Sequence, residues 1–245
     1  MKLKLTILEI KNLRKNFGGI KAVDDCSLDI KEKLIYGLIG PNGSGKTTLF
    51  NLITGLSTED GGDIFFKGER INRLKTYQRI LRGIGRTFQL VRIFRGLRVI
   101  DNLLIPPQRK EEKLSALEKA HKLLDFVSLT RLEDEYAGNL SFGQQRLLEF
   151  ALVLMQDPDL ILMDEPTSGV NPAIIKRMLD HVTQLRDRGK TFIIVEHNIP
   201  AIMEVCDKII VLDHGRKIAE GTGEEISKDR KVIEAYLGSG AEVGA

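Results

Sequence analysis

The chain has 245 residues, 42% of them hydrophobic and 29% charged, so it is long enough to bury a substantial core within one large domain. Lysine and arginine outnumber aspartate and glutamate by only 37 to 34, a balance too even to indicate nucleic-acid binding. The two cysteines are too few for a disulfide framework or a cysteine zinc site, which favours the cytosol.

The start of the chain predicts a pair of β-strands. Residues 5–13 and 22–30 alternate between apolar and polar positions, which indicates a hairpin-like pair. Residues 1–6 lack the long apolar stretch of a secretory signal, and no apolar run approaches the length of a membrane span, about 18 residues or more. We therefore expect that any membrane-spanning part belongs to a partner.

A glycine-rich loop that follows an apolar run at 34–39 carries the most informative pattern in the chain. It matches G-x-x-x-x-G-K-[ST] and precedes a helix-like stretch; its residues are Gly40, Pro41, Asn42, Gly43, Ser44, Gly45, Lys46, Thr47 and Thr48. Glycines let successive backbone N–H groups turn inward toward phosphate oxygens, and the following helix adds its positive dipole end. We expect Lys46 to reach the β- and γ-phosphates and the Thr47 hydroxyl to ligate Mg²⁺. The pattern predicts that the chain binds a nucleoside triphosphate.

Further along, short apolar runs alternate with helical stretches. The predicted elements are strands at 63–66, 84–88, 160–163, 191–195 and 209–212, and a charged amphipathic helix at 113–127 within a helical region from about 97 to 155. Strands separated by helices are typical of βαβ units, so a mostly parallel sheet is expected.

An acidic pair ends the predicted strand at 160–163. Asp164 and Glu165 follow its four apolar residues, and parallel sheets place their ligands at the carboxyl ends of strands. Alone, such a pair is also common in a capped turn. In a βαβ chain with a phosphate loop, we expect Asp164 to hold Mg²⁺ through water and Glu165 to polarise or deprotonate the attacking water.

A third motif, Leu-Ser-Phe-Gly-Gln at 140–144, precedes a predicted helix. Ser141 is a good N-cap, and a helix N-terminus is an anion site. Together with the phosphate loop and the acidic pair, this motif makes the chain resemble ATP-binding cassette (ABC) proteins, whose signature reads Leu-Ser-Gly-Gly-Gln at this position. The resemblance implies that Ser141, Gly143 and Gln144 contact the γ-phosphate held by a second cassette. Phe142 replaces the first glycine and is expected to reduce or alter this contact geometry at most.

The resemblance assigns other residues one at a time. Gln89, in Arg-Thr-Phe-Gln, matches the glutamine of the Q-loop, which joins Mg²⁺ and water to the helical subdomain. His197 matches the switch histidine that faces the γ-phosphate, and Phe17 matches the aromatic residue that stacks on adenine, with a core position as the alternative. Asn171 lies in the D-loop, where the common pattern ends in aspartate; it can hydrogen-bond across a dimer but brings no charge. The remaining histidines are expected on the surface: His121, His181 and His214.

The implied fold class is α/β: a RecA-like P-loop NTPase core with an antiparallel β-subdomain and an inserted α-helical subdomain. We expect a single ABC ATPase domain over residues 1–245. Residues 1–89 and 158–245 would form the core and the β-subdomain, and residues 90–157 the helical subdomain that carries the signature motif.

A narrower resemblance is to the ATPase subunits of branched-chain amino acid importers. It rests on the segments 85–89, 92–94, 99–104 and 169–172, on the aromatic residue in the signature motif, and on the ending Val-Ile-Glu-Ala-Tyr-Leu-Gly. In that family a pair of ATPase subunits drives two membrane permeases fed by a solute-binding protein. The resemblance implies a peripheral subunit at the cytoplasmic face of the cell membrane that hydrolyses ATP with Mg²⁺ and binds no nucleic acid.

Two cassettes are expected to sandwich two ATP molecules, each site pairing Lys46 and Glu165 of one chain with Ser141 of the other. The second cassette is either identical or a paralogue. Two other interpretations stay open: an importer of urea or other amides, and a soluble ABC adaptor, such as one in iron–sulfur assembly, in which nothing crosses a membrane.

The segment 89–104 mixes apolar residues with basic ones, namely Val91, Ile93, Phe94 and Leu97 with Arg92, Arg95 and Arg98. Apolar anchors with a charged rim suit a groove that receives a short amphipathic helix of a permease. The alternative is that these apolar residues fill the core of the helical subdomain itself.

Overall fold

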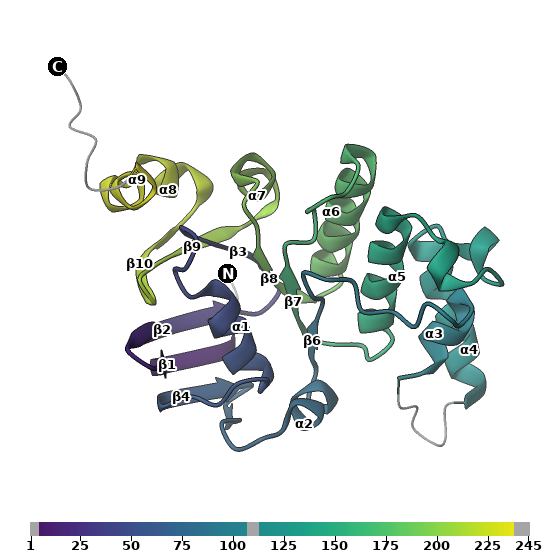
Figure 1. The fold of residues 1–245 in the computed structure, drawn as a ribbon, viewed down its shortest axis with the longest axis horizontal. Helices are drawn as coiled ribbons and strands as arrows, with labels where there is room; N and C mark the ends of the chain where they lie inside the picture. The colour runs from purple at the N-terminus through teal and green to yellow at the C-terminus, as the bar shows by residue number, and fades with distance from the viewer. Residues whose placement is uncertain (1–4, 107–112, 238–245) are drawn as a thin grey trace.

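Two β-sheets organise the computed structural model, which describes residues 5–106 and 113–237 (Figure 1). The smaller sheet is antiparallel with the strand order β2-β1-β4-β5. Its strands are β1 (Thr6–Phe17), β2 (Ile20–Lys31), β4 (Gly61–Phe66) and β5 (Glu69–Arg70). β1 and β2 form a hairpin in which Glu9 pairs with Asp29, so the predicted pair is confirmed, with longer strands than predicted.

The larger sheet is mostly parallel and has the strand order β10-β9-β3-β8-β7-β6. Its strands are β3 (Ile35–Ile39), β6 (Ile84–Arg86), β7 (Leu160–Asp164), β8 (Thr191–Val195), β9 (Lys208–Asp213) and β10 (Arg216–Gly221). Neighbouring strands from β6 to β9 run parallel, as the sequence predicted, and β10 pairs with β9 in the antiparallel sense. The sequence did not predict β10, because only Ile218 and Ala219 interrupt its polar residues.

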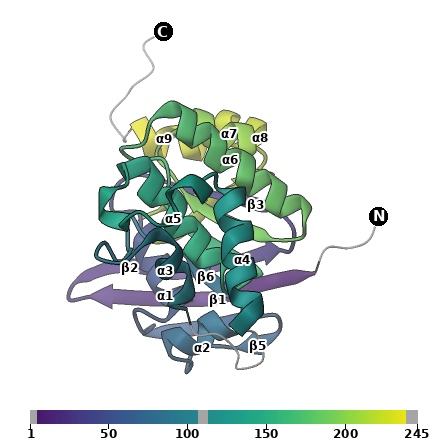
Figure 2. The ribbon, with the colours of Figure 1, turned by 90° about the vertical axis from the view of Figure 1, so that its right-hand side faces the viewer.

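Helices cover the larger sheet and the ends of both sheets. They are α1 (Lys46–Thr54), α2 (Thr76–Leu81), α3 (Val99–Leu104), α4 (Lys113–Phe126), α5 (Phe142–Leu154), α6 (Pro172–Asp187), α7 (Ile199–Val205), α8 (Gly223–Lys228) and α9 (Arg230–Leu237). In Figure 1, α3, α4 and α5 lie together on the opposite side of the larger sheet from β1 and β2, and Figure 2 views the molecule from their side. No helix of the described residues combines the length and the apolar character that a bilayer span requires.

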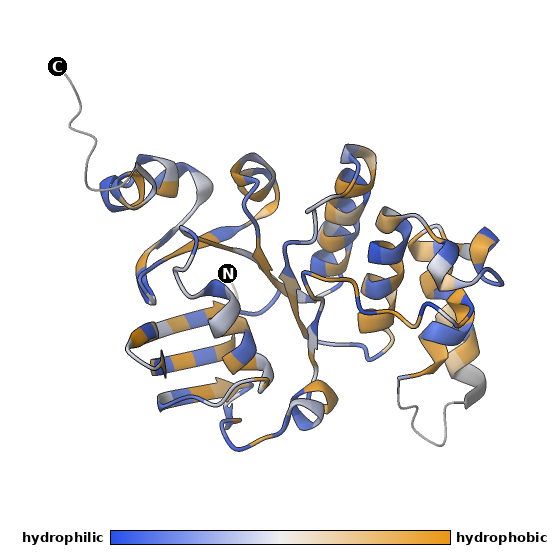
Figure 3. Cartoon of the chain, in the orientation of Figure 1, coloured by the Kyte–Doolittle hydropathy of each residue, from blue (hydrophilic) through white to orange (hydrophobic). Residues whose placement is uncertain are grey.

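The larger sheet separates two hydrophobic cores, because its central strands are buried on both faces. Every residue of β3, β7 and β8 is buried, and Figure 3 shows these strands as predominantly hydrophobic. On β3, Tyr36 and Leu38 belong to the core shared with α1 and the antiparallel sheet. Ile35 and Ile39 point to the opposite face and join the core beneath the helices. Such continuous apolar strands are typical of parallel sheets covered on both sides.

The prediction that His181 lies on the surface is wrong. This histidine lies on the inner side of α6 and is only 7% exposed. Its ring lies 4.3 Å from the ring of Phe126 on α4, and burial lowers the pKa of His181. The apolar spacing of Met178, Val182 and Leu185 around it marks the buried face of the helix, which single-residue reasoning about histidine missed. His121 and His214 are exposed, as predicted.

Candidate nucleotide-binding and hydrolysis site

Three neighbouring strands bring the predicted site residues to one edge of the larger sheet. β3, β8 and β7 are adjacent and parallel, so their carboxyl ends meet. The phosphate loop follows β3, the acidic pair ends β7, and His197 follows β8 by one intervening residue. Ligands of open parallel sheets bind at this edge, outside the carboxyl ends of the strands.

The phosphate loop is enclosed so tightly that glycine is required at two of its positions. A Cβ atom at Gly40 would lie 2.0 Å from the carbonyl oxygen of Leu212, and one at Gly45 would lie 2.2 Å from that of Ala22. Both glycines also have positive φ, 151° and 102°, which side-chain-bearing residues rarely adopt. Helix α1 begins directly after Gly45, so the N–H groups of its first turn are available to an anion in the loop.

Lys46 is buried within this loop and is only 6% exposed. Its Nζ donates hydrogen bonds to Gly40 O at 2.8 Å and to Pro41 O at 2.9 Å. Burial lowers the pKa of Lys46, and the negative charges of Glu165 and Asp164 oppose this shift. An entering phosphate would offer charged oxygens in place of neutral carbonyl acceptors, and such charge-assisted hydrogen bonds are stronger.

Glu165 adopts an unusual backbone conformation immediately after β7. Its φ is 47°, in the left-handed region, while its N–H still donates to Val195 O at 2.9 Å. A residue other than glycine in this region is uncommon and often marks a functional position. The chain therefore turns sharply at the residue that the sequence singled out as the base.

The carboxylate of Glu165 joins two other predicted residues. Gln89 Nε2 donates to Glu165 Oε2 at 3.0 Å, and His197 Nε2 lies 2.9 Å from Glu165 Oε1. The three side chains come from the segment after β6, from the end of β7 and from the loop after β8. For this contact to be a hydrogen bond to the ionised carboxylate, His197 Nε2 must carry the proton. The arrangement can hold a carboxylate ready to accept a proton from water.

Glu196 fixes the loops that carry these groups, a role that the sequence did not reveal. Its buried carboxylate accepts hydrogen bonds from the backbone N–H of Thr167 at 2.8 Å and of His197 at 3.1 Å. The segments after β7 and β8 are thereby tied together. A carboxylate between a buried strand and a histidine is the signal that sequence reasoning could have used.

The signature motif lies at the N-terminus of α5. Ser141 is its N-cap, with its hydroxyl accepting from Gln144 N at 3.4 Å while Gln144 Oε1 accepts from Ser141 N at 2.9 Å, so the N-cap prediction is confirmed. A Cβ atom at Gly143 would lie 2.4 Å from Ile174 Cδ1, so glycine lets α5 approach α6 closely. Ser141 is exposed and Gln144 is half-buried, and within the described residues no hydrogen bond joins either side chain to the phosphate loop.

Two departures from the family pattern have visible local roles. Phe142 lies against the D-loop of its own chain, because its ring is 3.3 Å from where a Cβ atom at Gly169 would be. Asn171 is the N-cap of α6, and its Oδ1 accepts from Ala173 N at 2.8 Å. Its side-chain oxygen is thus engaged within the chain.

Phe17 ends β1 and is 52% exposed, so the alternative of a core position is wrong. Lys15 Nζ lies 5.4 Å from the centre of its ring and forms an ion pair with Asp60 at 2.9 Å. Asp60 also accepts from the backbone N–H of Asn16 at 2.6 Å. An exposed aromatic ring on a braced strand end is a suitable stacking platform for a base.

An ion pair between Arg146 and Glu149 on α5, with Arg146 Nη1 3.5 Å from Glu149 Oε2, ties this helix to the segment that carries Gln89. Arg146 Nη1 donates to Phe88 O at 2.5 Å, and Arg146 Nη2 donates to Gln89 O. Glu149 Oε1 accepts from the N–H groups of Phe88 at 3.3 Å and Arg92 at 3.1 Å. Both side chains are buried, and burial raises the pKa of Glu149. Sequence reasoning missed the pair, although two charges three residues apart in an apolar helix were a signal for it.

We predict that Glu149→Ala lowers the free energy of unfolding by about 3–5 kcal/mol, because it leaves the Arg146 charge buried without its partner. The measurement is denaturant unfolding of the intact chain. Glu149→Gln is the matched control, since it keeps one oxygen that can accept from the two backbone N–H groups and should cost less. Equal losses in the two variants would contradict a specific role for the acceptor oxygen.

Comparison with known proteins identifies the class to which this site belongs. A family model described as ABC transporter matches residues 23–168, and one described as branched-chain amino acid ATP-binding cassette transporter matches residues 216–242. The chain belongs to the ABC transporter family as an ATP-binding cassette, and ATP hydrolysis is its activity. Its relatives define its branch of that family more narrowly.

Two curated relatives carry the same description. The probable branched-chain amino acid transport ATP-binding protein LivG of Archaeoglobus fulgidus is 38% identical over 248 residues, with 96% of each chain covered. The high-affinity branched-chain amino acid transport ATP-binding protein BraF of Pseudomonas aeruginosa is 37% identical, covering 95% of this chain and 98% of its own. The chain is thus a member of the branched-chain amino acid branch of ABC ATP-binding subunits.

Solved structures agree with this assignment. A nucleotide-free ATP-binding cassette from an ABC transporter has a TM-score of 0.86 at 37% identity, with 96% of this chain and 100% of that chain covered. A dimeric cassette in a post-hydrolysis state, bound to ADP and phosphate, has a TM-score of 0.78 at 26% identity, with 88% of this chain and 98% of that chain covered. The predicted fold class is therefore confirmed.

Proposed function

We propose that the chain binds ATP with Mg²⁺ at its phosphate loop and that, as one of two cassettes, it drives uptake of branched-chain amino acids through membrane permeases. The observation that carries the catalytic part is the contact of Gln89 and His197 with Glu165 at the edge where the phosphate loop lies. The solute class is supported by the match of the C-terminal segment and by the names of the relatives.

Each group at the site has a task in this proposal. Lys46 binds the β- and γ-phosphates, Glu165 accepts the proton of the attacking water, and His197 holds the γ-phosphate and the carboxylate in register. Thr47, Gln89 and Asp164 offer the hydroxyl, amide and carboxylate oxygens that suit Mg²⁺. Bound Mg²⁺ would neutralise charge on the β- and γ-phosphate oxygens.

The second cassette completes the site in this proposal. Ser141 is exposed and Gln144 is partly exposed at the N-terminal end of α5, where they can meet a nucleotide held by the neighbouring cassette. The dimeric relative with ADP and phosphate supports this arrangement. We further propose that residues 90–157 move as one subdomain, with the Arg146–Glu149 pair carrying the Gln89 segment along.

The permeases would dock on the segment that follows Gln89. Phe94 is 54% exposed, and Leu90 and Leu97 are also exposed among arginines, which suits an amphipathic helix with apolar anchors. Ile93 instead packs against the core beneath the helices, so the alternative of a core role fits that residue. Docking here would place the peripheral subunit at the cytoplasmic face of the membrane and link the permease to the nucleotide through Gln89.

We predict that Phe94→Asp leaves ATP binding and basal hydrolysis near normal but abolishes assembly with the permeases, because it places a charge at the apolar centre of the docking surface. Pull-down of co-expressed permeases measures the effect. Thermal melting serves as the folding control, and Tyr77→Asp, which alters another exposed aromatic residue on α2, is the matched surface variant. A folded Phe94→Asp protein that still assembles would place the docking surface elsewhere.

Uptake of labelled solutes tests the function as a whole. A strain that lacks this subunit should lose uptake of leucine and keep uptake of urea, and the intact subunit should restore the loss. Loss of urea uptake alone would favour an amide importer. Unchanged uptake of both, without permeases in the purified complex, would favour a soluble adaptor.

A further inference from the structure

Arg86, the last residue of β6, lies in the nucleotide site but has no task in the proposed hydrolysis. Its Nη2 donates to Asp164 Oδ2 at 2.9 Å, and the two side chains are each only 6% exposed. Charges buried to this degree are tolerated when they are paired with an opposite charge. Arg86 is therefore the counter-ion of the carboxylate to which magnesium is assigned above.

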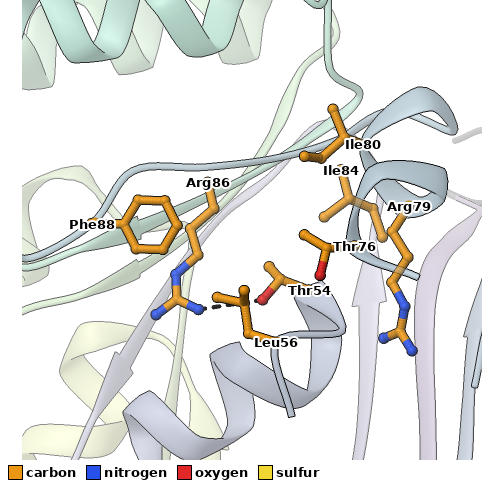
Figure 4. Close-up of a pocket in the computed structure, with 8 residues that line it drawn as sticks. All are labelled: Thr54, Leu56, Thr76, Arg79, Ile80, Ile84, Arg86 and Phe88. Atoms are coloured by element: carbon orange, nitrogen blue, oxygen red, sulfur yellow. Dashed lines mark hydrogen bonds between the residues drawn. The ribbon is translucent and has the colours of Figure 1, made fainter. Parts of the chain in front are cut away.

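The position of Arg86 is fixed independently of its acidic partner. Its Nη1 donates to Asn51 Oδ1 at 2.7 Å, and also to Thr54 Oγ1 at 3.3 Å (Figure 4); both acceptors are on α1. The guanidinium carbon lies 5.5 Å from the centre of the Phe50 ring and 5.0 Å from that of the Phe88 ring, distances at which the aromatic faces attract a cation. Because α1 and the two rings also contact it, the guanidinium retains partners of its own when the carboxylate takes another one.

A small cavity gives this guanidinium room to withdraw. A space of about 60 Å³ between α1, α2 and β6 is lined by Arg86 and by Thr54, its partner on α1 (Figure 4). A short movement of the guanidinium away from Asp164 would therefore displace few neighbouring atoms. Buried arginines in close-packed surroundings do not have this freedom.

We propose that Arg86 supplies the positive charge at Asp164 when magnesium is absent and competes with the cation for this carboxylate. The proposal rests on the proposed function, in which Asp164 holds Mg²⁺. At such short range the repulsion between a guanidinium and a divalent cation exceeds the effect of one hydrogen bond, even at an effective dielectric of about 20. Free Mg²⁺ is thereby kept out of the site, and the cation enters with a nucleotide whose phosphates add negative charge.

Thermal unfolding of the intact chain, with EDTA or with Mg²⁺ alone, tests this proposal through Arg86→Met. The wild-type melting temperature should be the same in EDTA and in Mg²⁺. Arg86→Met should melt at a lower temperature in EDTA, because Asp164 loses its partner, and should recover on addition of Mg²⁺. A titration should give a dissociation constant for Mg²⁺ about tenfold or more below that of the wild type. Asp164→Asn in the same background should remove the recovery.

Arg79→Met is the matched control, since Arg79 is a buried arginine beside the same cavity and donates to backbone carbonyls, among them Leu52 O and Ile53 O of α1 (Figure 4). It should lower the melting temperature equally in EDTA and in Mg²⁺. If Arg86→Met does not fold, Arg86→Lys is the substitute, since it keeps the charge but loses the planar fork. Its melting temperature in EDTA should fall less than that of Arg86→Met, and Mg²⁺ should raise it again.

Two outcomes separate the failure of this proposal from that of the proposed function. Stabilisation of the wild type should be larger with ATP and Mg²⁺ than with ATP and EDTA; an equal effect would contradict the magnesium site itself. If that difference is present, the test turns on Arg86→Met. The competition proposed for Arg86 is wrong if this variant binds Mg²⁺ no more tightly than the wild type, or if Mg²⁺ does not restore its melting temperature.

Discussion

Glu165→Gln should keep ATP binding and lower turnover by about 10²–10⁴-fold, the range typical of a lost general base. The amide has the shape of the carboxylate and can still contact Gln89 and His197, which lie 3.0 and 2.9 Å from the two oxygens of Glu165. It cannot, however, take a proton from water at neutral pH. The variant should also accumulate as an ATP-bound dimer, because the sandwich opens after hydrolysis. Steady-state turnover and size-exclusion chromatography with ATP measure the two effects.

Lys46→Ala is the contrasting variant. Lys46 is a phosphate ligand in the proposal, so its loss should weaken nucleotide binding itself rather than the chemical step. Equilibrium binding of ATP separates the two cases. Wild-type turnover in the Glu165→Gln protein would remove the assignment of the general base.

Ser141→Arg should abolish the part of the hydrolysis rate that depends on two cassettes. In the wild type, the rate of the isolated chain should rise more than linearly with protein concentration, because Ser141 belongs to the neighbour's site. Arginine at the exposed N-cap of α5 places bulk and a misdirected cation in the interface, while monomeric ATP binding should stay close to normal. Hydrolysis measured over a wide concentration range tests the expectation.

Ser141→Ala separates the interface from the helix cap. It removes the hydroxyl that accepts from Gln144 N and should cost about 0.5–2 kcal/mol of stability, without adding bulk. Concentration dependence should therefore survive in Ser141→Ala and be lost in Ser141→Arg. Rates strictly proportional to concentration in the wild type would point to a self-sufficient monomer or a tight preformed dimer, which sedimentation distinguishes.

The sequence predicted most closely the strands whose hydrophobic pattern is uninterrupted. The apolar strands at 160–163 and 191–195 are buried on both faces, so they read as uninterrupted hydrophobic runs and their limits were predicted within one residue. β10 and the short helix α2 were missed. Each has an exposed face and a mixed composition, and each takes its shape from the neighbouring element on which it lies.

The residues of the candidate site likewise fall into those that the sequence predicted and those that it did not. Lys46, Asp164 and Glu165 could be named because backbone chemistry fixes their spacing within short motifs. Arg86, Glu149 and Glu196 could not be linked to their distant partners, Asp164, Phe88 and Thr167, because the fold alone brings these residues near. Arg86 meets Asp164 across 78 residues of chain, and Glu149 meets Phe88 across 61. A motif records neighbours along the chain and contains no information about such contacts.

The close enclosure of the phosphate loop ties the nucleotide site to the smaller sheet as well. Ala22 O, on β2, limits the space at Gly45, while Gly215 donates to Ser44 O and accepts from Asp24 N, each at 3.0 Å. The antiparallel sheet therefore forms part of the boundary of the binding site. In a chimeric cassette, an exchange of the N-terminal strands would transplant part of the loop's support together with the exposed ring offered to the base. Whether the two parent cassettes are compatible would then depend on the positions of backbone carbonyl groups, which a sequence alignment does not show.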